Sequence, residues 1–309
     1  MSLKNSMIWY ASKIDTRLND DFHKLSDKSG YNIRDEAKLI AKDFKNMGYK
    51  TNTKFQSPSQ IQETDLNNLI NYWKEVKNYD IGTMQNKMTA LRHVLKEAGN
   101  PLYKISNGEL GIGSGRDILN SSNLDKSYSL SEKAKDYIGN RPPEVQAAIK
   151  LMQSYGLRID ESIKAVWAIT HGREISSNNN INLMASWTKN GKSRSFQMRD
   201  GGKTITEVKS ILKGYSIKTN LKQTYSKLEN TFTALKKIDG DKAHPHGLRH
   251  GYAHTRYYEI TGMTAPAAGG LRYAEMDVKQ RKLYHNACKI IAVELGHSRE
   301  TIARTYVGK

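Results

Sequence analysis

The sequence of 309 residues has one cysteine, Cys288, and no long run of apolar residues. A single cysteine cannot form an internal disulfide, which fits a reducing compartment and excludes a cysteine-rich metal cage. No apolar stretch approaches the roughly 18 to 20 residues that a transmembrane helix needs, and the N-terminus has no signal-peptide core. The sequence therefore predicts a soluble, cytoplasmic protein without a membrane partner, long enough for two domains.

Acidic residues are few relative to basic ones. The chain carries 49 Lys and Arg against 31 Asp and Glu, a net charge of +18. Residues 1–120 hold 18 basic and 14 acidic residues, which leaves 31 basic and 17 acidic residues, a net +14, for residues 121–309. A surplus of this kind indicates a polyanionic partner, because each Lys or Arg that neutralises a phosphate releases counterions. A basic protein without such a partner is the alternative.

Apolar residues at helical spacing predict three helices between residues 31 and 105. The first is expected to stop at Gly48, and the third to begin with Thr83 as its cap and to stop at Gly99. Lys87, Arg92 and Lys96 lie mostly off the apolar face of the third helix. Such side chains are usually a solvated surface, but on a basic chain they are candidates for DNA contact.

Turn-forming residues concentrate in the stretch 106–130, which we interpret as a linker between two domains. Residues 1–30 are weakly patterned and are expected to form an N-terminal arm or a short helix. A helical domain then spans 31–105 and a second domain 131–309. Residues 190 and 191 are Asn-Gly, the strongest hairpin signal of the chain, and predict a turn between strands at 181–188 and 193–198. The expected fold is mainly α with a small antiparallel β-sheet.

The residues most suggestive of chemistry lie mainly near the C-terminus. A His-Gly-Leu-Arg sequence at 246–249 is followed by Leu-Gly-His ending at 297, and a tyrosine lies nine residues further on. Upstream, Gly-Leu-Arg ends at residue 158, and a lysine precedes the Asn-Gly turn. The catalytic candidates, in chain order, are Arg158, Lys189, His246, Arg249, His297 and Tyr306.

These residue types are those needed to cut a phosphodiester without a metal. The reaction requires a nucleophile, hydrogen-bond donors for the charge that develops on the phosphate, and an acid for the leaving 5′-oxygen. A tyrosine hydroxyl can be the nucleophile. Two arginines can hold the phosphate, because a guanidinium group donates two parallel, permanently charged hydrogen bonds. His297 can add a third donor.

In this order the motifs resemble the tyrosine recombinase (phage integrase) family. Within it, His-Gly-Leu-Arg-His-Gly-Tyr-Ala at 246–253 and Pro-Ala-Ala-Gly-Gly at 266–270 look like the integrases of bacterial mobile genetic islands. The resemblance implies a SAM-like helical core-binding domain at 31–105 and a tyrosine-recombinase catalytic domain at 131–309. It also implies strand cleavage and rejoining through a 3′-phosphotyrosyl intermediate.

The resemblance also assigns roles to individual residues. Lys189 would protonate the leaving oxygen, although Lys192 lies on the other side of the same turn and is an alternative. His246 would assist proton transfer near the tyrosine, and Glu161 would orient Arg158 or support His246. Lys192 and Arg194 are expected to contact DNA.

Partners follow from the same resemblance. It implies double-stranded attachment or recombination sites as substrate, a tetramer on DNA, an accessory directionality factor and no cofactor. The protein would act in the bacterial cytoplasm and associate with the nucleoid when bound. Compact members of the family have fewer residues between the arginine and histidine that correspond to Arg249 and His297, so Thr261–Lys289 looks like an insertion.

Two other functions remain open. A type IB topoisomerase uses nearly the same residues, and a catalytically silent DNA-binding accessory protein would share the charge. A metal site is the competing interpretation of the closely spaced histidines His244, His246, His250 and His254. No Glu follows His250 as in His-Glu-x-x-His, and no cysteine lies nearby, so no metal is expected.

Overall fold

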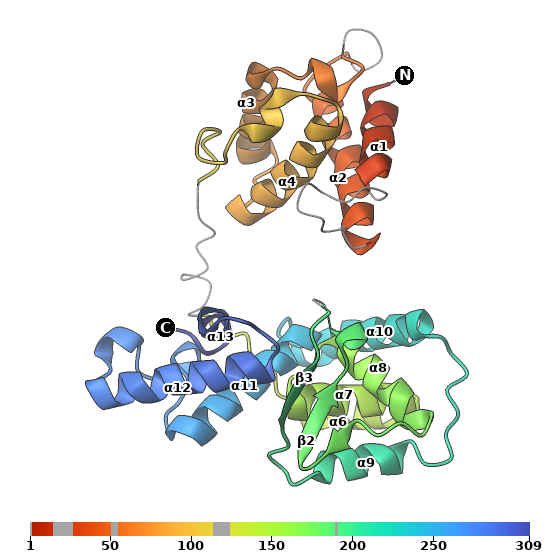
Figure 1. Ribbon diagram of the computed structural model, residues 1–309, viewed down its shortest axis with the longest axis vertical. Coiled ribbons are helices and arrows are strands. Elements are labelled where there is room, and N and C mark those ends of the chain that lie inside the picture. The colour runs from red at the N-terminus through yellow and green to blue at the C-terminus, as the bar shows by residue number, and fades with distance from the viewer. Residues whose placement is uncertain (1, 15–26, 51–54, 114–123, 189–190) are drawn as a thin grey trace. The chain divides into compact units, whose positions relative to one another are not determined.

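The fold is mainly helical with one small antiparallel sheet, which confirms the predicted fold class. The computed structural model describes residues 2–14, 27–50, 55–113, 124–188 and 191–309. The chain divides into two compact units, Met1–Arg116 and Asp117–Lys309 (Figure 1). The boundary falls inside the Gly-, Ser- and Asn-rich stretch expected as a linker. Leu110 and Ile112 nevertheless pack into the core of the first unit, and Tyr128 packs into the second.

The first unit is a helical bundle whose apolar faces meet in one core. Trp73 lies fully buried in it, and its Nε1 donates a hydrogen bond to Asp43 Oδ2 at 2.9 Å. The first helix packs against the second and fourth, so the first described residues belong to the bundle. The elements are α1 (Leu3–Ile14), α2 (Asp27–Asn46), η1 (Pro58–Gln60), α3 (Glu63–Asn71), η2 (Tyr72–Val76), α4 (Ile81–Glu97) and η3 (Pro101–Lys104).

Helix α4 begins earlier than the sequence predicted, so the expected cap at Thr83 is wrong. The N-cap is Asp80, whose carboxylate accepts hydrogen bonds from the backbone N–H and the hydroxyl of Thr83, each at 2.8 Å. A carboxylate accepts both donors and also suits the positive end of the helix dipole, which favours Asp80 over Thr83 as the cap. The predicted stops are confirmed, since Gly48 and Gly99 follow their helices with φ of 88° and 70°.

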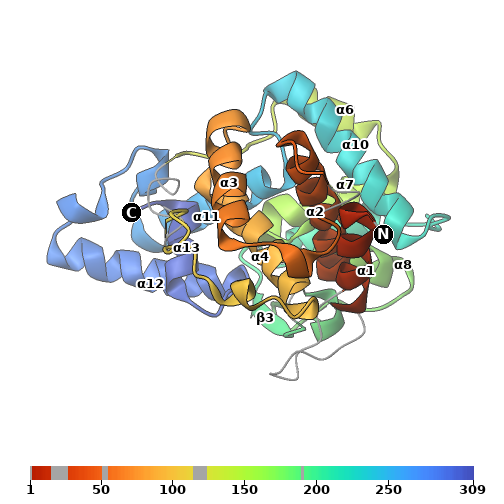
Figure 2. The ribbon, with the colours of Figure 1, turned by 90° about the horizontal axis from the view of Figure 1, so that it is seen from above.

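The second unit contains two cores. One is enclosed by the helices before residue 240 and the sheet, and the other by the last three helices. Helices α11 and α12 lie side by side, and α13 packs against both (Figures 1 and 2). The helices are α6 (Glu132–Gly139), α7 (Pro143–Tyr155), α8 (Ile159–Thr170), α9 (Lys203–Ile211), α10 (Leu221–Asp239), α11 (Pro245–Thr261), α12 (Val278–Glu294) and α13 (Glu300–Val307).

The sheet has three strands in the order β1 (Ser176–Ser177), β2 (Asn180–Leu183) and β3 (Arg194–Gln197). Both pairs are antiparallel, and Leu183 lies opposite Arg194. The sequence did not predict β1. It joins β2 through Asn178 and Asn179, which both adopt positive φ, the backbone conformation of a tight hairpin turn.

The connection between β2 and β3 is longer than the predicted tight hairpin. The strand expected to run to residue 188 ends at Leu183, and a 3-10 turn, η4 (Ala185–Trp187), follows it. Two contacts favour this turn over extended pairing: Trp187 is buried in the core, and Lys164 Nζ donates to the Ser186 carbonyl at 2.8 Å. Asn190, the first residue of the predicted Asn-Gly turn, lies outside the described residues.

Candidate active site

Tyr306 lies on α13, the last helix, and is only 6% exposed. Its hydroxyl accepts a hydrogen bond from Arg249 Nε at 3.2 Å and lies 3.3 Å from His297 Nε2. Arg249 lies 48 positions before His297 in the chain, and His297 lies 9 positions before Tyr306. The three residues nevertheless converge on one oxygen atom. The structure brings together three of the six residues predicted to be catalytic.

Arg249 is held by backbone carbonyls as well as by Tyr306. It lies on α11 and is 1% exposed, and its two terminal nitrogens donate to the carbonyls of Gly156 and Leu295. The Gly156 carbonyl immediately precedes the Leu157-Arg158 segment, and the Leu295 carbonyl follows α12. Arg249 thus ties together the segments that carry Arg158, His297 and Tyr306.

Arg158 is positioned at the start of α8 by Glu161. The Glu161 carboxylate accepts from both the Arg158 backbone N–H and its Nη1, each at 2.8 Å. The Arg158 side chain is 21% exposed, whereas that of Glu161 is 1% exposed. The sequence analysis expected Glu161 to orient Arg158 or to support His246, and the hydrogen bonds of Glu161 to Arg158 fit the first of these roles.

Glu161 also pairs with a residue expected to contact DNA. Arg194, at the start of β3, donates from Nη2 to Glu161 Oε2 at 2.7 Å, and its side chain is only 7% exposed. Its Nε and Nη1 are buried and have no hydrogen-bond partner among the described residues. The guanidinium lies so close to Gly296 that a Cβ there would collide with it, and Gly296 has a φ of 68°. Both facts explain the glycine in the Leu-Gly-His sequence.

Positive charge dominates this group. Burial alone would raise the pKa of Glu161, but Arg194, Arg158, Arg249 and a backbone N–H hold that pKa below its ordinary value. Burial and the charges of Arg249 and Arg158 lower the pKa of Arg194 to about 10, against the opposing effect of Glu161. Three guanidinium groups therefore share one carboxylate, and the site keeps a net positive charge suited to a phosphate.

His297 is neutral in this environment. Burial, followed by the charges of Arg249, Arg158 and Arg194, lowers its pKa to about 4. Its Nε2 lies 3.3 Å from Arg249 Nη2, which can only donate, and 3.3 Å from the Tyr306 hydroxyl. We infer that Nε2 carries no proton and acts as an acceptor in the DNA-free protein.

The other histidines of the predicted motif surround the Tyr306 ring. The ring centroid of His250 lies 4.8 Å from that of Tyr306, and that of His246 lies at 6.4 Å. His254 Nε2 lies 2.8 Å from the Tyr306 carbonyl oxygen, which can only accept. His246 is exposed and lines a cleft of about 440 Å³ beside α10. His244 caps α11, because its Nδ1 accepts from the Gly247 N–H at 3.0 Å.

The predicted general acid cannot be placed, because Lys189 lies outside the described residues. Lys192 lines a pocket of about 210 Å³ together with Arg158, Arg194 and His297. The segment after β2 therefore does approach the arginine cluster.

The basic residues predicted to contact DNA from the first unit have local partners. Lys87 is 4% exposed and its Nζ forms an ion pair with Glu36 at 2.7 Å. Arg92 Nε donates to the Ile105 carbonyl at 3.0 Å, and its Nη2 to Asn107 at 2.8 Å. Lys96 is exposed on α4, with its Nζ 6.0 Å from the Tyr103 ring centroid.

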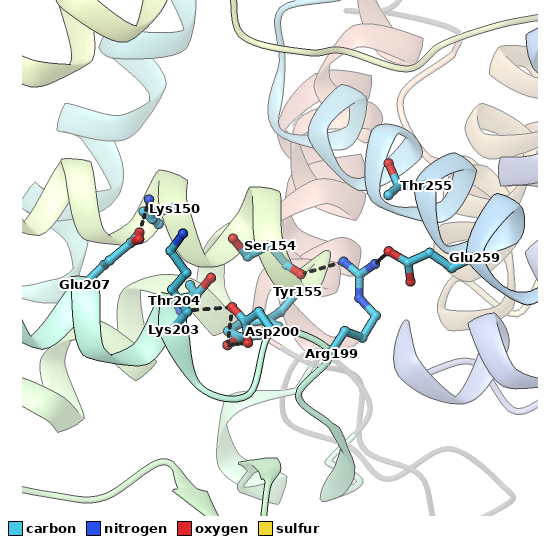
Figure 3. Close-up of a pocket in the computed structure, with 10 residues that line it drawn as sticks. All are labelled: Lys150, Ser154, Tyr155, Arg199, Asp200, Lys203, Thr204, Glu207, Thr255 and Glu259. Atoms are coloured by element: carbon cyan, nitrogen blue, oxygen red, sulfur yellow. Dashed lines mark hydrogen bonds and ion pairs between the residues drawn. The ribbon is translucent and has the colours of Figure 1, made fainter.

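A separate pocket of about 360 Å³ lies against α7, α9 and α11 (Figure 3). Its acidic and basic side chains pair with one another: Lys150 with Glu207, and Arg199 with Glu259. Arg199 also donates to the Ser154 carbonyl at 3.2 Å, so this pocket joins α7 to α11. It shares no residue with the Tyr306 group and keeps no surplus of one charge.

Two further features concern metals and membranes. Among the residues that the structure describes, no three His, Cys, Asp or Glu side chains gather in a way that could hold a metal ion. Within the same residues, no helix combines the length and the apolar character needed to cross a membrane.

Comparison with known proteins finds one family match, and it lies in the first unit. Residues 16–103 match the family described as "Phage integrase, N-terminal". A solved structure described as "Crystal structure of XerA recombinase" is 16% identical, with coverage of 97% of this chain and 93% of that chain and a TM-score of 0.33. No curated protein matches the chain significantly. The family match lies within the first unit and agrees with the resemblance stated from the motifs of the second.

Proposed function

We propose that this protein is a site-specific DNA recombinase that cleaves and rejoins DNA through Tyr306. The observation that carries the proposal is the position of the Tyr306 hydroxyl, 3.2 Å from Arg249 Nε and 3.3 Å from His297 Nε2. A tyrosine held beside a buried guanidinium and a neutral imidazole can lose its proton and attack phosphorus. The phage integrase match of residues 16–103 supports the same class of reaction.

The proposed reaction exchanges one phosphodiester for another. The Tyr306 oxygen attacks phosphorus, a Tyr306–3′-phosphate bond forms, and the bond from phosphorus to the 5′-oxygen breaks. The tyrosine proton passes to His297 Nε2, which then donates a hydrogen bond to a phosphate oxygen. His246 assists this transfer. Rejoining is the reverse, with a 5′-hydroxyl as the nucleophile.

Arg158 and Arg249 bind the scissile phosphate in this scheme. Arg158 is partly exposed and fixed by Glu161, so it is available to an incoming oxyanion. Arg249 uses four of its five N–H groups, on Tyr306, Gly156, Leu295 and His297, so a phosphate would take the fifth or replace one of these partners. Lys189 protonates the leaving 5′-oxygen, and Lys192 is the alternative across the turn.

Finer assignments belong to the same proposal. We propose that the enzyme is the integrase of a bacterial mobile genetic island, acts as a tetramer on attachment-site DNA and works with a directionality factor. Sequencing the junctions formed when the protein is expressed beside its native flanking DNA would identify the sites. A supercoil relaxation assay separates this function from that of a type IB topoisomerase, which would relax plasmids that lack those sites.

The test of the nucleophile uses a duplex of the identified site with a nick beside the cleavage position. The nick lets the cut fragment escape, so wild type should accumulate a covalent protein–DNA band on a denaturing gel. Tyr306→Phe keeps the ring but removes the attacking oxygen, and it should bind this DNA without forming the band. Tyr258→Phe, at a 59% exposed tyrosine of α11, is the matched control and should behave as wild type. An adduct formed by Tyr306→Phe would disprove the assignment.

A further inference from the structure

Residues 261–289 run from the end of α11 through the first part of α12, and they pack against the helix that carries Tyr306. Helix α13 contacts α11, α12 and the 3-10 turn η5 (Pro266–Ala268). Ala265 and Met276 of this segment share a core with Ala303 and Val307 of α13. The sequence marked the segment as an insertion without a role, and the structure places it against the candidate nucleophile.

The C-terminal end of α13 is fixed by two contacts with this segment. The Tyr284 hydroxyl donates to the Gly308 carbonyl at 2.7 Å, and Tyr284 is fully buried. Gly308 has a φ of 85°, and a Cβ there would collide with the backbone of Ala267 in η5. Val307, between Tyr306 and Gly308, is also fully buried. The residues that follow Tyr306 are therefore packed against the 261–289 segment.

The N-terminal end of α13 is fixed by a chain of polar contacts. Glu300, the first residue of the helix, accepts from Arg304 Nη2 at 3.0 Å and lies 3.2 Å from His285 Nδ1. The other nitrogen of His285 lies 2.9 Å from the hydroxyl of Tyr273, in the 3-10 turn η6 (Tyr273–Glu275). Since a carboxylate accepts, Nδ1 of His285 donates to Glu300.

We propose that the 261–289 segment is a clamp that holds both ends of α13 and so positions the Tyr306 hydroxyl beside Arg249 and His297. This inference rests on the proposed role of Tyr306 as nucleophile. Helix α13 has 8 residues, too few to be stable alone, so its position depends on tertiary contacts. A small shift of such a helix would break the contacts of 3.2 Å and 3.3 Å that align the hydroxyl.

The test compares two buried tyrosines in the full-length protein. Tyr284→Phe removes the hydrogen bond to Gly308 and keeps the ring. Tyr257→Phe is the matched control, because Tyr257 is also fully buried and its ring centroid lies 6.0 Å from that of Tyr284. Within the part of the chain that the structure describes, the Tyr257 hydroxyl has no hydrogen-bond partner. Single-turnover formation of the covalent adduct should slow about tenfold or more in Tyr284→Phe, with unchanged DNA affinity and no change in Tyr257→Phe.

A second measurement does not depend on catalysis. Amide hydrogen exchange should become faster in α13 of Tyr284→Phe and of His285→Gln, while α7 and α8 stay as protected as in wild type. Wild-type rates and exchange in both variants would overturn the clamp. An equal loss of rate and affinity, or faster exchange throughout the unit, would also overturn it, because either indicates a general packing defect.

The outcomes also separate this inference from the proposed function. If wild type forms no adduct, the recombinase proposal fails, and hydrogen exchange still tests whether the segment holds α13. If wild type forms the adduct and Tyr284→Phe matches it, only the clamp fails. Loss of the adduct in Tyr284→Phe together with its retention in Tyr306→Phe would identify Tyr284 as the nucleophile and overturn both.

Discussion

The two units use buried basic side chains in different ways. In the first, the buried Lys87 pairs with Glu36 at 2.7 Å, and the half-buried Arg92 donates to Ile105 and Asn107. Such contacts join α4 to α2 and to the segment after η3. These two side chains therefore hold α4 in place within the bundle.

In the second unit, three arginines gather around one carboxylate. Glu161 accepts hydrogen bonds from Arg158 and Arg194, and its single negative charge offsets only part of the positive charge of the cluster. Arg249 lies fully buried beside them. Guanidinium groups that crowd together repel one another, and the repulsion is strong where water is excluded. Such a cluster is retained where an anion binds, so clustering locates the site better than net charge does.

The largest expected effect comes from removing an arginine of the cluster in the second unit. Arg158→Ala or Arg249→Ala should lower single-turnover cleavage about 10²- to 10³-fold, because each removes a donor to the charge developing on the phosphate. Binding to the same DNA, measured by fluorescence anisotropy, should change far less. Arg92→Ala in the first unit is the control and should leave the cleavage rate of bound DNA unchanged. Equal losses of rate and affinity in Arg158→Ala and Arg249→Ala would show that these arginines only hold DNA.

A smaller effect is expected from exchanging one buried cation in each unit for methionine. Arg194→Met should slow cleavage roughly tenfold, since Glu161 then loses one of the two arginines that fix it and holds Arg158 less firmly. Lys87→Met should not change the rate, because Glu36 is 33% exposed and can be solvated. The cleavage rates of both variants are measured on fully bound DNA, at saturating protein concentration. A wild-type rate in Arg194→Met would show that Arg194 contributes packing only and does not help Glu161 to position Arg158.

The three residues that converge on one oxygen were predictable because the chemistry requires their types and the family resemblance gives their order. Arg249, His297 and Tyr306 were identified from motif spacing, and the structure places them within hydrogen-bond distance. Helices with a strong apolar period were also predictable, as the stops at Gly48 and Gly99 show. In each case the signal is local or belongs to one motif.

What was missed depends on partners distant in the sequence. Arg194 was expected to contact DNA, and its burial could not be foreseen because its partner Glu161 lies 33 positions away. Lys87 is separated from its partner Glu36 by 51 positions. Strand β2 was predicted too long because alternation cannot reveal that Trp187 is drawn into the core by a 3-10 turn. Tertiary contacts outweigh local pattern at these positions.

The pH dependence of the free energy of unfolding tests the buried histidines of the two units. Burial, with smaller contributions from nearby positive charges, lowers the pKa of His250 to about 4 against the effect of a backbone hydrogen bond. An imidazole in the unfolded chain has a pKa of about 6.5, so below that pH the unfolded chain binds a proton that the folded chain does not bind. The free energy of unfolding should fall by up to about 1.4 kcal/mol per pH unit from this group, until about pH 4.

His250→Gln should make the stability of the protein less sensitive to acid. Urea unfolding of the full chain at pH 7 and pH 5 gives the measurement, and His171→Gln, at an exposed histidine, is the control. In the first unit, burial and Lys96 also lower the pKa of His93, so His93→Gln should act in the same direction. An unchanged pH dependence in His250→Gln would mean that the folded protein accepts the proton.

The smallest expected effect concerns DNA contact by single lysines. If exposed Lys96 meets one phosphate, Lys96→Ala should reduce the slope of log affinity against log salt by about 0.9. Lys192→Ala, beside the arginine cluster, should give a similar change, and Lys87→Met should give none, because its Nζ is already paired with Glu36. Fluorescence anisotropy on nonspecific duplex at several salt concentrations measures the slopes. A change in Lys87→Met as large as that in Lys96→Ala would contradict the expectation that burial decides which lysine of α4 meets a phosphate, since both residues lie on that helix.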